Sequence, residues 1–158
     1  MIERRIRAFH EAGHCWGLWT LGRRFRYTTL RPRASGFDGL TVLYRRWDFD
    51  ETYPLAVVAV CGPLAELIHR RRQSADQSPE TVNSHLAAIA GGGHDDISKC
   101  RMLLRDSAKL DELGSAMRAH WDGIDLVAEE LLEKHTLSGR RVFEILDGRG
   151  PGVAETPC

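Results

Sequence analysis

Apolar side chains in the first twenty positions recur at intervals of three or four residues, with polar or charged residues between them. This spacing places the apolar residues on one face of an α-helix. Gly22 stands where a glycine commonly ends a helix. The pattern predicts an amphipathic helix that ends near Gly22, with its apolar face formed by Ile2, Ile6, Phe9, Trp16 and Trp19.

Two short stretches after this helix have the composition of β-strands. Residues 26–33 are rich in β-prone side chains and contain a proline near their end. Since proline lacks the N–H that a central strand would need, we expect residues 26–33 to form an edge strand. Residues 34–39 are rich in turn-forming types, and residues 40–44 predict a second strand that pairs with the first as a hairpin or small sheet.

A second long helix is predicted over residues 54–72, where apolar side chains lie on nearly all sides of the helix. Such a distribution is typical of a buried helix. Pro54 fits the first turn, and the pair Gly62-Pro63 predicts a kink.

The rest of the chain predicts helices separated by polar or glycine-rich connectors. We expect helices over residues 78–90, 95–104, 108–135 and 139–146, the last capped by Ser138. The tail, residues 148–158, is rich in glycine and proline and is expected to be disordered. Together these segments predict a single domain over residues 1–147, of the mainly α-helical α+β class, with a small β-sheet or hairpin.

The net charge and the hydropathy of the chain limit the classes of partner that it is expected to bind. Lys plus Arg and Asp plus Glu each total 22, so no overall field favours nucleic acid or an anionic membrane. No apolar run reaches the roughly 18 residues of a membrane span, and the first residues lack the apolar region of a signal peptide. We expect a soluble, cytoplasmic protein with no nucleic-acid partner and no membrane span.

The four cysteines are far apart in the sequence and form no C-x-x-C pair. They fall mostly within apolar helical stretches, which predicts reduced core residues rather than disulfides or metal ligands. They are Cys15, Cys61, Cys100 and Cys158.

The strongest chemical signal is the sequence H-E-A-G-H at residues 10–14, within the first predicted helix. Positions i and i+4 lie over one another on a helix, so His10 and His14 are able to bind one metal ion, with Glu11 beside it. This spacing is typical of zinc hydrolases, in which zinc activates a water molecule and the glutamate accepts its proton. Gly13 costs about 1 kcal/mol relative to alanine in a helix interior, which favours a structural reason such as close backbone approach.

A catalytic zinc ion needs a third protein ligand, and spacing alone does not choose among six candidates. The longer motif H-E-x-x-H-x-x-G-x-x-H does not fit, because Thr20 occupies the place of its last histidine. The candidates are Glu66, His69, His85, His94, Asp95 and Asp96.

Five segments resemble, in the same order, the peptidase domain of FtsH, a family of AAA-dependent membrane metallopeptidases. Residues 9–14 (F-H-E-A-G-H) are similar to its zinc helix, and residues 29–33 (T-L-R-P-R) to its strand ending in Pro-Arg. Residues 62–66 (G-P-L-A-E) resemble its Gly-Gly-x-Ala-Ala-Glu helix, and residues 92–97 (G-G-H-D-D-I) its Gly-Ala-x-Asn-Asp-Leu turn. Residues 130–139 (E-L-L-E-K-H-T-L-S-G) are similar to its Leu-Leu-Glu-x-Glu-Thr-Leu-x-Gly segment.

The resemblance implies a zincin-like metallopeptidase fold and a set of roles for this chain. His10 and His14 would bind Zn²⁺, Glu11 would be the catalytic base, and Asp96 would be the third zinc ligand. Asp95 stands where the family has asparagine, and it is therefore a competing ligand.

Glu66 belongs to the segment that resembles the second helix of the family. We expect it to orient a metal-bound histidine rather than to bind the metal, since carboxylates commonly play that part around zinc.

The chain also departs from the FtsH pattern. In that family, membrane helices and an AAA unfoldase precede the peptidase domain, whereas here the zinc helix starts within ten residues of Met1. We therefore expect an ATP-independent zinc endopeptidase that hydrolyses peptide bonds in flexible or unfolded segments. A homo-oligomer, and a separate unfoldase or adaptor acting in trans, are possible partners.

The alternative function is a non-catalytic, zinc-stabilised protein-binding module derived from a peptidase. The missing unfoldase favours this alternative, whereas the intact Glu11 argues against it, because a purely structural zinc site needs no base.

Substrate binding is expected at the predicted edge strand, residues 26–33. An extended peptide would add to this strand through main-chain hydrogen bonds. The competing interpretation is that residues 40–44 cover one side of the strand and another chain covers the other, as an oligomer interface.

Overall fold

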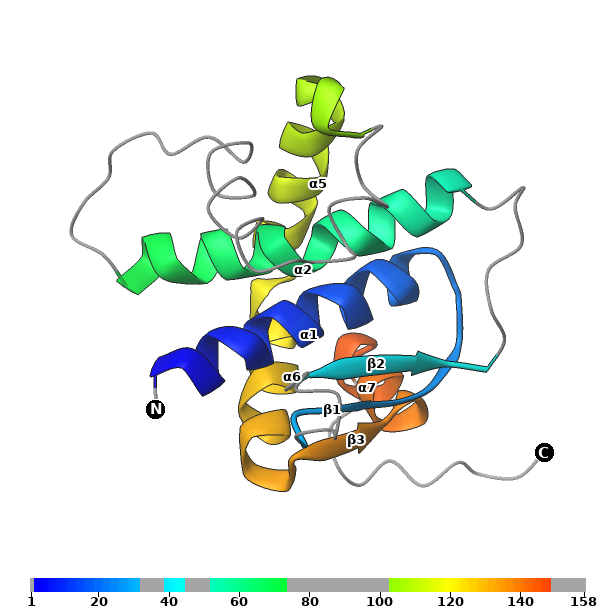
Figure 1. Cartoon of the computed structure of the whole chain (residues 1–158), viewed down its shortest axis with the longest axis vertical. Coiled ribbons are helices and arrows are strands. Elements are labelled where there is room, and N and C mark those ends of the chain that lie inside the picture. Colours follow the sequence, from blue (N-terminus) through cyan, green and yellow to red (C-terminus); the bar gives the residue numbers. More distant parts are fainter. Residues whose placement is uncertain (1, 32–38, 45–51, 74–102, 149–158) are drawn as a thin grey trace.

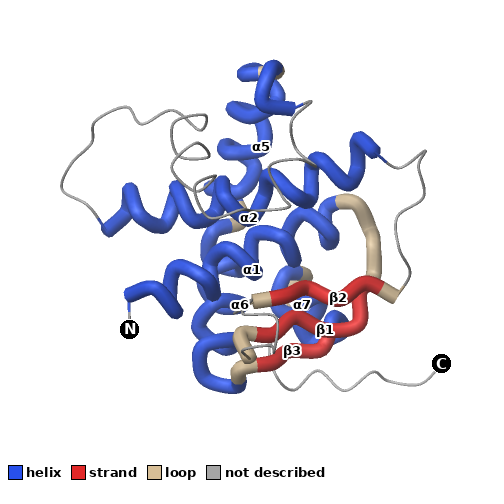
Figure 2. Tube along the Cα trace, viewed as in Figure 1, coloured by secondary structure: helices blue, strands red, loops and turns tan. Residues whose placement is uncertain are grey.

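The computed structural model of the chain describes residues 2–31, 39–44, 52–73 and 103–148. Helices predominate within these residues, and three short strands form one antiparallel sheet (Figure 1 and Figure 2). The mainly helical α+β class predicted from the sequence is therefore confirmed. In chain order the elements are α1 (Ile2–Thr20), β1 (Phe25–Thr29), β2 (Leu40–Leu43), α2 (Thr52–Gln73), the 3₁₀ turn η2 (Leu103–Arg105), α5 (Ser107–Ala119), α6 (Trp121–Lys134), β3 (Thr136–Ser138) and α7 (Gly139–Leu146).

The predicted first helix, α1, lies between α2 and the sheet (Figure 1). Of its predicted apolar face, Phe9 and Trp16 are almost completely removed from solvent, and Ile6 and Trp19 are partly buried. The Phe9 ring stacks on that of Trp121 from α6, with 5.5 Å between their centroids and an angle of 3° between their planes. This buried aromatic stack stabilises the packing of α1 against α6.

The second long helix is also confirmed, and its residues 56–69 are all buried. The helix is not interrupted at Pro63. By length and composition α2 would be able to cross a membrane, although most of its apolar stretch is buried inside the protein. A core helix of a soluble protein passes the same test, so α2 does not by itself indicate a membrane span.

The predicted pair of strands is present, but its arrangement differs from the prediction. The strand order is β2-β1-β3, so β1 is the central strand and not an edge strand. It pairs antiparallel with β2 on one side and with β3 on the other. The prediction was wrong because β1 ends at Thr29, before Pro32, and the proline therefore never has to donate a hydrogen bond within the sheet.

The third strand, β3, was not predicted because its three residues lie between two helices. α6 ends at Lys134, and the residue that caps it, His135, adopts the left-handed backbone conformation with φ 66°. The His135 carbonyl oxygen accepts hydrogen bonds from the backbone N–H of Leu30 at 2.9 Å and from the hydroxyl of Thr29 at 3.0 Å. The turn at His135 therefore holds β3 beside β1.

The single helix predicted over residues 108–135 is in fact two helices, α5 and α6. His120 separates them with φ −107° and ψ 18°, outside the helical region. No proline stands at this break, and the spacing of the apolar residues did not indicate it either. The last helix, α7, is confirmed together with its cap, since the Ser138 hydroxyl accepts a hydrogen bond from the N–H of Arg141.

Other sequence predictions fall outside the described residues. These are the helix over residues 78–90, most of the helix over residues 95–104, and the tail after residue 148.

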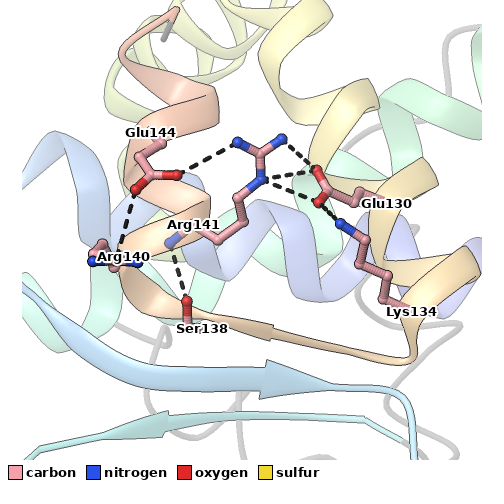
Figure 3. Close-up of polar contacts among 6 residues, drawn as sticks. All are labelled: Glu130, Lys134, Ser138, Arg140, Arg141 and Glu144. Carbon is pink, nitrogen blue, oxygen red and sulfur yellow. Dashed lines mark hydrogen bonds and ion pairs between the residues drawn. The ribbon is translucent and has the colours of Figure 1, made fainter. Parts of the chain in front are cut away.

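A cluster of charged side chains joins α6 to α7 around β3 (Figure 3). Glu130 on α6 is 8% exposed, and it accepts hydrogen bonds from Arg141 Nε at 3.1 Å and Nη2 at 3.0 Å. Lys134 also donates to Glu130, and Arg141 Nη1 contacts Glu144 at 3.4 Å. The hydrogen bond from Arg141 lowers the pKa of Glu130 below its ordinary value of 4.5, although burial opposes this shift.

Arg141→Met should destabilise the protein by about 1–3 kcal/mol at pH 7, because the buried carboxylate of Glu130 loses its main partner. A lowered pKa in the folded state contributes stability above the unfolded value, and this stability is lost as pH falls through the folded value. The difference between wild type and variant, measured by denaturant unfolding, should therefore shrink as pH falls below about 4.5.

Lys134→Met provides the control, because the Lys134 side chain is half exposed. We expect it to cost less than about 1 kcal/mol. An equal loss in the two variants, or a loss in Arg141→Met that does not depend on pH, would contradict the assignment of Arg141 as the main partner.

Candidate metal centre

The candidate site forms where α1 and α2 come very close together. A Cβ atom added at Gly13 of α1 would lie 2.3 Å from the carbonyl oxygen of Cys61, and one at Gly17 would lie 3.1 Å from the Cys61 Sγ. Both values are shorter than ordinary van der Waals contact. The close backbone approach expected at Gly13 is therefore confirmed, and it brings the α1 histidines against α2.

A third glycine, on α2, makes room for the histidine rings. A Cβ atom at Gly62 would lie 2.6 Å from His14 Nε2 and 3.0 Å from His10 Nε2. Any side chain at this position would displace the two imidazoles. Gly62 was interpreted in the sequence only as part of a kink, since nothing in a single sequence distinguishes a glycine that makes space from one that bends a helix.

The two imidazoles of the H-E-A-G-H motif converge as the helical spacing predicts. His10 Nε2 and His14 Nε2 lie 3.0 Å apart, and the ring planes are nearly perpendicular at 84°. His14 is buried, and its Nδ1 lies 2.8 Å from the carbonyl oxygen of Val58 on α2. Because a carbonyl oxygen only accepts hydrogen bonds, Nδ1 of His14 is the donor in this contact, and its Nε2 faces His10.

The His10 ring is also oriented through its Nδ1 atom, in this case by a carboxylate. His10 Nδ1 lies 3.5 Å from Glu66 Oε2, and Arg70 donates to Glu66 Oε1 from Nε at 3.1 Å and from Nη2 at 2.8 Å. Burial alone would raise the pKa of Glu66, but His10 and Arg70 together lower it. The Glu66 carboxylate therefore orients the His10 ring through Nδ1, so that Nε2 faces His14.

This arrangement fits a metal ion. The two Nε2 atoms lie at hydrogen-bond distance, 3.0 Å, so they share a proton or, in its place, a metal ion. Zinc binds neutral imidazole nitrogen at about 2.0–2.1 Å, so both Nε2 atoms are able to reach one ion. In addition, an outer hydrogen bond from Nδ1 to a carbonyl or carboxylate is the usual accompaniment of zinc-bound histidine.

The part of the chain that the structure describes contains no group of three metal-binding side chains, so it identifies no third ligand. Glu66 lies on the Nδ1 side of His10, which agrees with the expected orienting part rather than with direct ligation. His69 stacks on Phe9 with 3.7 Å between ring centroids. The other four candidates, His85, His94, Asp95 and Asp96, lie outside the described residues.

The Glu11 side chain is 6% exposed and lies between α1 and the sheet. Its Oε2 accepts a hydrogen bond of 2.8 Å from the hydroxyl of Thr41 on β2. Sequence reasoning missed Thr41, because a threonine in a short β-prone run is ordinary and only the fold brings it to α1.

The cysteines that the structure describes behave as predicted. Cys15 and Cys61 are buried and form no disulfide. Burial raises the pKa of each thiol to about 12, and the charge of Glu11 adds to the shift of Cys15. Both thiols are therefore neutral near pH 7, whereas Cys100 and Cys158 lie outside the described residues.

No family model matches the chain, and no curated protein matches it either. The resemblance to the FtsH peptidase domain therefore stays a prediction that depends on its sequence segments. The fold brings residues 9–14 against residues 62–66 through His10 and Glu66. It also joins the beginning of residues 29–33 to residues 130–139, since the hydroxyls of Thr29 and Thr136 lie 2.7 Å apart.

Purified protein should contain about one zinc ion per chain, and His10→Ala or His14→Ala should lose it, because too few ligands would remain. Asp96→Ala should also lose zinc, while Asp95→Ala should keep it. Elemental analysis of the dialysed proteins measures this. Loss of zinc in Asp95→Ala combined with normal content in Asp96→Ala would reverse the choice of third ligand.

Glu66→Gln should weaken zinc binding by about 10- to 100-fold without unfolding the protein, because a neutral amide holds the His10 tautomer less firmly. Competition with a zinc chelator measures the affinity. Glu129→Gln is the matched control, since Glu129 forms an exposed ion pair with Arg5 and should leave the affinity unchanged. Equal affinity in Glu66→Gln and wild type would show that Glu66 does not orient His10.

Proposed function

We propose that this chain is a zinc-dependent endopeptidase with a zincin-like, FtsH-type peptidase domain. The observation that carries the proposal is the pair of Nε2 atoms 3.0 Å apart, each with its own Nδ1 turned to an acceptor. Both imidazoles thus present Nε2 to the same point, which is the arrangement that two histidine ligands of one metal ion adopt.

The proposed function gives the histidines and Glu11 different roles. His10 and His14 would hold the ion, together with Asp96 as the resemblance implies. When bound, zinc lowers the pKa of a coordinated water molecule and polarises a carbonyl group. Glu11 follows His10 directly on α1, so its carboxylate would accept the proton of the attacking water and return it to the amine that leaves.

The sheet provides a place for an extended substrate. Within the described residues β2 is hydrogen-bonded to β1 alone. The edge of the sheet on this side is therefore β2 and not β1, the strand that the sequence had suggested. The hydroxyl of Thr41 on β2 contacts Glu11, which places the edge next to the proposed base. A peptide added to β2 would have to be extended, and folded proteins would therefore resist cleavage.

The zinc-stabilised binding module remains the competing function. It would keep the histidines and the metal but would not need Glu11 as a base. The two functions therefore differ in what happens when Glu11 alone is changed.

Glu11→Gln should keep its zinc and its fold but lose at least about 100-fold of the hydrolysis of fluorescein-labelled casein, an unfolded protein, because only the base has been removed. Fluorescence release measures cleavage, and elemental analysis measures zinc. Wild-type protein that is loaded with zinc and cleaves no unfolded substrate would favour the binding module.

Glu129→Gln serves again as the control, because it alters an exposed carboxylate outside the site. It should cleave casein at the wild-type rate. ATP should not change the rate for this chain alone, and a stable folded protein should remain intact.

A further inference from the structure

The contact between Glu11 and the sheet involves both oxygens of the carboxylate. Oε2 accepts the 2.8 Å hydrogen bond from the Thr41 hydroxyl. Oε1 lies against Gly39, where an added Cβ atom would be only 2.7 Å from it and 3.3 Å from Glu11 Cδ. The carboxylate therefore has a donor on one oxygen and a space that only glycine leaves on the other.

The Thr41 hydroxyl is itself fixed by its neighbours. It lies 3.1 Å from the hydroxyl of Thr28 on β1, the residue opposite it in the strand register, and 3.9 Å from Cys15 Sγ on α1. A hydroxyl group has one proton, and an ionised carboxylate is the stronger acceptor, so the proton of Thr41 is directed to Glu11. Because Thr28 is fully buried, it also limits how far Thr41 moves.

A glutamate on a helix surface normally samples many side-chain conformers. Here the two contacts come from one short segment, residues 39–41, and both act on the end of the side chain. Their effect therefore falls on the direction of the Glu11 carboxylate.

We propose that Thr41 is a positioning residue that fixes the Glu11 carboxylate for proton transfer, and that Gly39 provides the space into which its second oxygen fits. This inference depends on the proposed peptidase function for its catalytic consequence. Its structural part, the direction of the carboxylate, stands independently of catalysis.

Thr41→Val keeps the shape of the side chain and removes the hydroxyl, so it should lower kcat for casein cleavage by about 10- to 100-fold. KM and zinc content should stay within about twofold of wild type. Thr41→Ser restores the hydroxyl and should recover most of kcat, and Gly39→Ala should lower kcat by crowding Oε1.

Thr136→Val is the matched control. It removes a hydroxyl that contacts another threonine, Thr29, from the strand at the other side of the sheet. It should leave kcat within about twofold of wild type. Equal losses of kcat in Thr136→Val and Thr41→Val, or no recovery in a folded Thr41→Ser, would overturn the positioning role.

Crystal structures of the zinc-loaded full chain provide a readout that does not need activity. Glu11 should have one conformer, directed to residue 41, in wild type and Thr41→Ser, and a different or divided conformer in Thr41→Val. An unchanged Glu11 conformer in Thr41→Val would overturn the inference even if the enzyme is active. If wild type has no activity but the conformers change as described, the peptidase proposal fails and the positioning of Glu11 by Thr41 stands.

Discussion

The close approach of α1 and α2 is the constraint on which the rest of the site depends. Gly13 and Gly17 permit this approach from one helix, and Gly62 makes room for the imidazoles from the other. Only at this separation does the Val58 carbonyl reach His14 and the Glu66 carboxylate reach His10. The contacts that turn both Nε2 atoms toward each other are therefore a consequence of helix packing.

Around this helix pair, the sheet contacts Glu11 and the C-terminal helices support the position of α1 and β1. The sheet meets α1 on the side of Glu11 and holds that carboxylate, while α6 supports α1 through the stack of Phe9 on Trp121. The charged cluster of Glu130 and Arg141 keeps α6, β3 and α7 in place around β1.

The sequence predicted what depends on local pattern. The period of α1, the buried run of α2 and the Ser138 cap were predicted because neighbouring residues determine them. The central position of β1, the strand β3 and the break at His120 were not, since each depends on contacts between segments far apart in the chain. The same distinction holds in the site: His10, Glu11 and His14 are visible as a motif, whereas Thr41 and the space beside Gly62 exist only once the chain has folded.

The separation along the chain between the histidines and the groups that orient them has a consequence for biosynthesis. The Val58 carbonyl lies 44 residues after His14, and Glu66 lies further along the same helix. A ribosome releases α1 well before α2, so the emerging α1 carries both imidazoles without the hydrogen bonds that fix their tautomers. If the chain binds zinc as proposed, high-affinity capture would follow the docking of α2, and a nascent chain that stalls between the two helices would hold the metal only weakly.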